Sequence, residues 1–217
     1  MKSNIYFKLM LFSFLAITVS CKTIQRSDLR TSSNTLTQKL PVLTPKVDEK
    51  SLANTFTINV GGTMQGATYA DKRIQDLVTL FERDVTENIC EPGKVPAGTI
   101  SLFISYSEIK MNNWGLILLN AFTAMVPAIL GVPITNTRED IEINVEISDK
   151  QGNKISEYTG NGKGKAVMAF YYGYKGTNGG GDFPIARKAN IIAYNMAMEE
   201  IKEKISKDAP NLTEKLK

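Results

Sequence analysis

The feature that most constrains the fold of this chain is a central stretch without charge, WGLILLNAFTAMVPAILGVP, which runs from Trp114 to Pro133. No charged residue falls between Lys110 and Arg138. The 20 residues of the stretch match a bilayer-spanning helix in length. Because large apolar patches are seldom left bare on soluble monomers, the stretch must be a membrane span, part of a core, or a surface for a partner.

The segments on either side of the stretch bear on this choice. TISLFISYSEI, Thr99–Ile109, is rich in β-formers, and IEINVEIS, Ile141–Ser148, alternates between apolar and polar residues. Both predict β-strands. A membrane span between them would place the two strands on opposite sides of a bilayer and remove them from a shared sheet, so a span is the least favoured role. A core-capping insertion and a membrane- or partner-facing element are favoured equally.

As a helix, the stretch has a narrow small or polar stripe that includes Asn120 and Thr123, and a broad bulky stripe. Such a helix is more hydrophobic than a surface helix should be. The bulky stripe therefore forms the candidate interaction surface, and Val126 lies beside it. The residues of this candidate surface are Trp114, Leu118, Phe122, Met125 and Ile129.

The rest of the chain predicts the order β-α-β-β-β-α. The predicted strands are Phe56–Val60, Thr99–Ile109, Ile141–Ser148 and a segment from Lys154 toward Tyr172, and the predicted helices begin near Asp71 and Pro184. Apolar residues at helical spacing, centred on Phe81 and Ile192, mark the faces that pack on the sheet. The predicted fold class is α+β: a four-stranded, mainly antiparallel sheet with two helices on one face and an apolar insertion, residues 113–136, between the second and third strands.

The N-terminus predicts export. Lys2 and Lys8 form a basic region around the apolar run Leu9–Ile17, which is the layout of a secretory signal and is too short to span a bilayer. Ser20 before Cys21 resembles a bacterial lipobox, although residue 18 is Thr where the lipobox has Leu, Val or Ile. The resemblance implies cleavage after residue 20 and a lipid anchor on Cys21. The alternative is an ordinary signal peptide with an incidental cysteine.

The chain therefore divides into a signal peptide (1–20), a lipidated N-terminus and tether (21–50), one α/β domain (51–207) and a flexible tail (208–217). Thr, Ser, Gln, Asn and Lys dominate the first part of the tether, which is typical of a solvated segment. A chain of 217 residues supports one domain with a sizeable core.

In the order of its elements the chain resembles small bacterial envelope lipoproteins. These are the plug lipoprotein of the lipopolysaccharide-assembly barrel, the auxiliary lipoproteins of lipid-transporting ABC systems, and the N-terminal domain of the propeller protein of the Tol-Pal system. The resemblance covers about residues 50–207. It is a likeness of fold and implies no functional residue.

Residues suited to catalysis or to metal binding are scarce. The chain has no His, which removes the commonest general base and zinc ligand. Cys90 reads as a small buried hydrophobe. The paired acids Glu139–Asp140 and Glu199–Glu200 read as solvated surface. The glycine-rich runs 160–166 and 173–183 do not match a phosphate-binding loop. We therefore expect no enzyme activity, no cofactor and no metal.

Three glycines, Gly160, Gly162 and Gly164, are spaced two apart. On an extended strand all three would face the same way and let another element approach the backbone closely. A flexible loop is the alternative.

These patterns predict a non-catalytic, lipid-anchored envelope protein that faces the periplasm, on the outer membrane. Its expected partners are the membrane, through Cys21, another envelope component of a transport or assembly complex, and a lipid or glycolipid. The alternative is a free-standing module that holds a small apolar ligand between the insertion and the sheet. The net charge of +4, with acids and bases interleaved, argues against nucleic acid.

Overall fold

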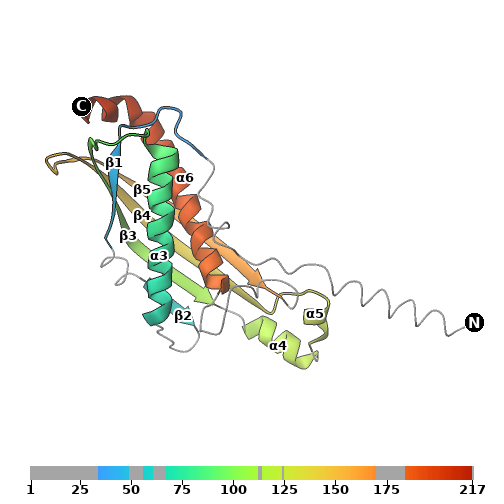
Figure 1. Ribbon diagram of the computed structural model, residues 1–217. Coiled ribbons are helices and arrows are strands. Elements are labelled where there is room, and N and C mark those ends of the chain that lie inside the picture. Colours follow the sequence, from blue (N-terminus) through green and yellow to red (C-terminus); the bar gives the residue numbers. More distant parts are fainter. Residues whose placement is uncertain are drawn as a thin grey trace, which may run out of the picture.

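The computed structural model describes residues 34–48, 56–60, 67–111, 114–123, 125–169 and 184–216 (Figure 1). The predicted signal peptide, the lipidation site Cys21 and the glycine-rich run 173–183 lie outside these residues, as does the side chain of Trp114.

The structure confirms the α+β class and the predicted order of elements, and it adds one strand at the start. The elements are β1 (Leu43–Val47), β2 (Phe56–Val60), α3 (Ala67–Asp84), η2 (Val85–Ile89), β3 (Gly98–Met111), α4 (Trp114–Phe122), α5 (Val126–Ile129), β4 (Thr135–Asp149), β5 (Lys154–Met168) and α6 (Pro184–Lys215). The helix α3 begins at Ala67, so Asp71 lies inside it and is not its N-cap. Pro184 opens α6, as the sequence predicts.

The sheet has five strands and is mixed. Antiparallel pairing joins β3 to β4 and β4 to β5, while β1 and β2 both run parallel to β3. The two short strands share one edge of β3: β1 lies beside its beginning and β2 beside its end (Figure 1). The turn between β4 and β5 is held by Asp149, whose carboxylate accepts the backbone N–H groups of Gln151 and Asn153, each at 2.8 Å.

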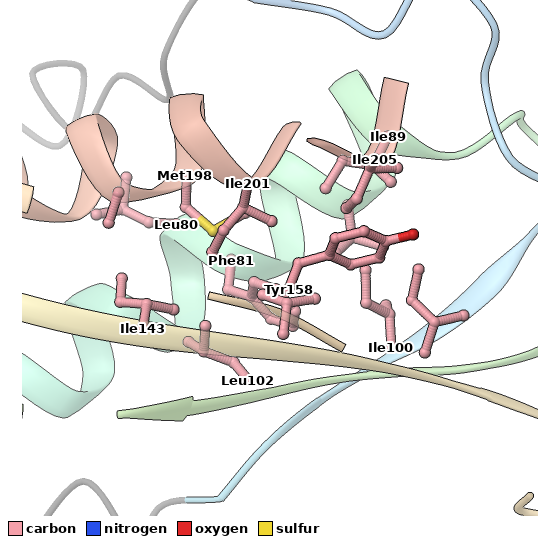
Figure 2. Close-up of a cluster of buried hydrophobic side chains, with 14 of the residues drawn as sticks. Leu80, Phe81, Ile89, Ile100, Leu102, Ile143, Tyr158, Met198, Ile201 and Ile205 are labelled. Carbon is pink, nitrogen blue, oxygen red and sulfur yellow. The ribbon is translucent and has the colours of Figure 1, made fainter. Parts of the chain in front are cut away.

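Both long helices cover the same face of the sheet (Figure 1). The helix-facing residues of β4 alternate along the strand from Thr137 to Ile147, and every one of them is buried. Figure 2 shows Phe81 of α3 and Met198 and Ile201 of α6 pointing at the strand residues Leu102 and Ile143. Burial of this apolar surface is the main source of stability for such a layered domain.

We expect Phe81→Ala to lower the free energy of unfolding by about 3–5 kcal/mol. The Phe81 side chain is fully buried in the centre of the core, so its truncation leaves a cavity. Chemical denaturation would measure the loss. The neighbouring Glu82→Ala is the control, because Glu82 is exposed and its removal should change stability by less than about 0.5 kcal/mol. Equal stabilities for the two variants would contradict this account of the core.

The prediction for Ile192 was less accurate. Ile192 is only half-buried, and Met196, on the same predicted stripe, is 47% exposed. The face of α6 that packs on the sheet carries Tyr194, Met198 and Ile201 instead. The face of α6 that contacts the sheet is largely alanine, so the hydrophobic periodicity of the helix is weak. The position of the buried face was therefore assigned incorrectly from the sequence.

The glycines at 160, 162 and 164 lie on β5, and all three are buried, which confirms the prediction of a close approach. The element that approaches is α6. A Cβ atom added to Gly162 would lie 1.8 Å from the backbone oxygen of Ala193, and one added to Gly164 would lie 1.8 Å from that of Ala189. The helix thus rests on the backbone of the strand.

Both boundaries of the predicted domain need correction. The tail is not frayed, because α6 continues to Lys215 and buries Leu212 and Leu216. At the other end, packing begins inside the predicted tether: Leu36 and Leu40 are buried, and Leu40 pairs with Cys90. Apolar residues that find a core surface order both segments.

Candidate functional site

The insertion between β3 and β4 consists of α4 and α5 (Figure 1). The two helices project from one end of the sheet, away from the layer formed by α3 and α6 (Figure 1). Met125 connects them in the left-handed conformation, with φ 62°. A residue other than glycine is uncommon there, and this conformation costs about 1–2 kcal/mol. The turn at Met125 ends α4 and redirects the chain into α5.

Large apolar side chains lie at the surface of this insertion. We name as the apolar insertion surface Leu118 (47% exposed), Leu119 (45%), Phe122 (86%), Met125 (41%), Val126 (52%), Ile129 (53%) and Leu130 (79%). Four of the five predicted surface residues belong to it, and only Trp114 is outside the described side chains. Because these side chains are exposed, they do not cap the core.

Leu119 and Leu130 were missed by the sequence analysis. A single helical stripe from Leu118 to Ile129 leaves them out, but α4 ends at Phe122 and the chain turns before α5. The whole stretch lacks charged residues, and this feature could have indicated that more of its large apolar residues are exposed.

The polar side chains of α4 are turned inward or bonded to their own helix. Asn120 is 4% exposed, and its Nδ2 donates to the carbonyl oxygen of Leu116 at 2.8 Å. The Thr123 hydroxyl donates to the carbonyl oxygen of Leu119 at 2.5 Å. The usual arrangement of a surface helix is therefore reversed, with apolar groups outside and the amide inside.

The backbone of the insertion also bonds to itself. The N–H groups of seven residues donate to carbonyl oxygens within the insertion, at 2.8–3.1 Å: Thr123, Met125, Val126, Ile129, Leu130, Gly131 and Val132. Pro127 has no N–H to satisfy. The connection and the second helix thus leave few backbone donors that need water.

Charged residues of both signs lie at the base of the insertion. Lys110 lies 2.8 Å from the Glu108 carboxylate and 3.6 Å from that of Asp140. Bonding to Glu108 raises the pKa of Lys110, so the amine stays charged at neutral pH. Arg138 and Lys165 lie in the same register row as Lys110, so the base also presents cations beside this ion pair.

A second notable group is a buried polar cluster built from four elements, which we name the Glu139 cluster. It contains Arg73 of α3, Ser107 of β3, Glu139 of β4 and Asn190 of α6, each no more than 1% exposed. The Glu139 Oε1 accepts hydrogen bonds from Asn190 Nδ2 at 2.8 Å and from the Ser107 hydroxyl at 3.1 Å, and it is ion-paired with Arg73. Glu139 was predicted to be solvated, and that prediction was wrong.

Burial raises the pKa of the Glu139 carboxyl, and the neighbouring Arg73 guanidinium opposes this rise. A fully buried carboxylate is tolerated only with such a partner. Because neither charged side chain reaches the surface, the cluster is suited to fixing the two helices on the sheet.

Two further ion pairs join α3 to α6. Asp76 binds Arg187 through both carboxylate oxygens, and Asp84 binds Lys202 at 3.0 Å. The later residue of α3, Asp84, pairs with the later residue of α6, Lys202, so the two helices run in the same direction. Burial raises the pKa of Asp84, and Lys202 opposes the rise. These contacts fix the register of the helical layer.

One cavity of about 590 Å³ lies away from both the insertion and the Glu139 cluster. It lies between residues 34–36 and α6, and its lining includes Glu199, Glu200, Lys202 and Glu203. These charged walls do not suit a small apolar ligand.

Cys90 is buried, as predicted, and burial raises the pKa of its thiol to about 11. Among the described side chains, no three Cys, Asp or Glu residues gather as a metal site would require. Within the same part of the chain, no helix is long and apolar enough to cross a membrane. Comparison with protein-family models and with curated proteins finds no match to this chain.

Proposed function

We propose that the protein is a lipid-anchored, periplasm-facing envelope protein that binds another envelope component through its apolar insertion surface, without catalysis. The observation that carries the proposal is the exposure of seven large apolar side chains on an insertion without charge. Surfaces of this kind mark sites of interaction with proteins or membranes. The rigid helix-on-sheet domain is suited to holding such a surface at a fixed orientation.

The N-terminal sequence supports the envelope location. A basic region, a short apolar run and the tripeptide Val19-Ser20-Cys21 follow one another in the order that lipoprotein signal peptidase recognises. A cysteine that carries several acyl chains holds a protein on a membrane without a spanning helix. The proposed setting is an outer-membrane transport or assembly complex that handles lipid or glycolipid.

Cys21→Ala is expected to abolish incorporation of a fatty-acid analogue and to leave the leader uncleaved, because Cys21 is the proposed acyl acceptor and the processing site. Metabolic labelling followed by electrophoresis of the full-length protein measures both effects. Cys90→Ala is the matched control, since the buried Cys90 thiol takes no part in anchoring. Normal labelling of Cys21→Ala would refute the anchor.

The triple variant Leu118→Ser, Phe122→Ser, Ile129→Ser is expected to melt within about 4 °C of the wild type, because exposed substitutions change stability little. Its solubility should rise, since it loses exposed apolar area. Differential scanning calorimetry and a solubility assay check the two effects. The buried Leu102→Ser is the control and should melt much lower. A comparable loss in the triple variant would show that the insertion is part of the core.

A further inference from the structure

We propose that the component bound by the apolar insertion surface is a lipid bilayer, and that α4 and α5 enter one leaflet as a monotopic element. This inference rests on the proposed function, because it names the partner of the same surface. It adds a second membrane contact, made by the folded domain, to the one expected at Cys21.

The hydrogen bonding of the insertion is compatible with burial in lipid. Backbone groups in hydrocarbon must find partners within the protein, because no water is present there. Seven N–H groups between Thr123 and Val132 meet this demand with internal bonds, and Pro127 has no N–H to satisfy.

The side chains agree with the backbone. Asn120 and Thr123, the polar residues of α4 and the turn, both donate to carbonyl oxygens of their own helix. Polar side chains in membrane helices commonly satisfy themselves in this way. The exposed side chains around them are aliphatic, thioether or phenyl groups, which gain when transferred into acyl chains. The side-chain donors of the insertion are thus bonded within it, while the Asn120 Oδ1 is buried without a hydrogen-bond partner.

The length of α4 limits how deeply the insertion can enter the bilayer. The nine residues of α4 span about 14 Å, which is less than half of the hydrocarbon thickness of a bilayer. The element therefore reaches into one leaflet only. The ion-paired Glu108, Lys110 and Asp140 at its base would remain at the level of the headgroups. Arg138 and Lys165, in the same register row as Lys110, would lie at this level too, where cations can contact anionic headgroups.

The tether expected from the lipobox is long enough for both contacts to reach one membrane. Residues 21–33 form a segment of 13 residues, which spans at most about 43–47 Å. The described chain begins at Asn34, which lines the same cavity as Glu200 of α6. Glu200 in turn accepts the backbone N–H of Asn161 on β5 at 2.9 Å.

Asn161 is level with Tyr106 of β3 across the sheet. From Tyr106 to Met111, where β3 ends and the insertion follows, the strand advances about 17 Å. The anchor can therefore lie in the bilayer that the insertion enters, and anchoring raises the local concentration of the surface at that bilayer.

An environment-sensitive dye at residue 122 tests the inference. The full chain with Phe122→Cys is labelled, purified as the cell makes it and reconstituted into vesicles of phosphatidylcholine alone. Val95→Cys is the matched control, because Val95 is 75% exposed and precedes the opposite end of β3. The wild-type chain serves as the labelling blank, since Cys90 is buried. Lipids with nitroxide on the acyl chain report the depth of the dye.

The expected result is a several-fold rise in emission and strong quenching by the acyl-chain nitroxide at residue 122, with neither effect at residue 95. Leu118→Ser and Ile129→Ser, added to Phe122→Cys, should return the dye to water. Dye in water at both positions would overturn the inference. A change without vesicles that grows with protein concentration would assign the surface to a second copy of the chain.

Failure of this inference is distinct from failure of the proposed function. Dye in water in these vesicles, which hold no other protein, together with a protein crosslinked to residue 122 in cells, would overturn the lipid partner and leave the proposed function in place. Mass spectrometry of the same sample reports acylation of Cys21 independently of the dye.

Discussion

Gly162→Ala is expected to destabilise the protein by about 3 kcal/mol or more, at or above the upper end of the usual cost of overpacking. The added methyl group would lie 1.8 Å from the backbone oxygen of Ala193. No side-chain rotation relieves a clash with backbone, so α6 would have to lift from β5. The lifting would also loosen Met198 and Ile201, whose side chains pack on the sheet from the same helix.

Thermal unfolding measures the effect, and for a protein of this size the expected fall in Tm is about 6–12 °C. Gly115→Ala is the matched control: nothing lies within 4 Å of its added Cβ, and alanine should favour the helix α4 by up to about 1 kcal/mol. If Gly162→Ala melts like the wild type, the close packing of α6 on β5 is incorrect.

Arg73→Met is expected to cost about 3–5 kcal/mol, because it leaves the Glu139 carboxylate buried without its counter-charge. Adding Glu139→Met should give a double variant no less stable than Arg73→Met alone, since the uncompensated charge is then gone. Urea denaturation of the wild type, the two single variants and the double variant forms a double-mutant cycle.

Lys207→Met provides the control for Arg73→Met. Lys207 pairs with Glu203 at 2.9 Å, but both side chains are about 70% exposed, so this change should cost less than about 0.5 kcal/mol. If Arg73→Met and Lys207→Met have equal effects, the Glu139 cluster does not hold the helices to the sheet.

The regular elements were predictable because their patterns are local. The apolar-polar alternation of Ile141–Ile147 follows from one buried face of a strand, and the stripe through Phe81 from one buried face of a helix. Pairing partners are not local. The five residues of β1 alternate between apolar and polar, but they contain Pro45, which argues against a paired strand, and nothing local indicates that they pair in parallel with β3.

The burial of Glu139 follows from its position on β4. The residue has the same parity on β4 as Ile141 and Ile143, so it faces the helices, and the alternation alone was sufficient to indicate this. The inward orientation of its partner Ser107 on β3 was not predictable, because a bulge interrupts that strand. The irregularity between Ile104 and Tyr106 shifts the parity of β3, which turns Ser107 inward and leaves Tyr106 exposed.

The exposure of the insertion could not be decided from its sequence. Residues that are apolar on every side give no periodicity to distinguish a buried helix from an exposed one. The exposure depends on the left-handed turn at Met125. Glycine or asparagine usually occupies such a turn, so a methionine there does not predict it. That turn prevents α4 and α5 from forming one long helix, and it places Val126 and Leu130 at the surface with Phe122.

The central claim is that the apolar insertion surface contacts another envelope component, and photocrosslinking in living cells tests it most directly. A benzophenone amino acid is placed at Phe122, which is 86% exposed, or at Val95 as the control. The account predicts an ultraviolet-dependent adduct with an envelope protein or lipid from residue 122 and none from residue 95. No adduct at residue 122, or the same adducts from both positions, would contradict it.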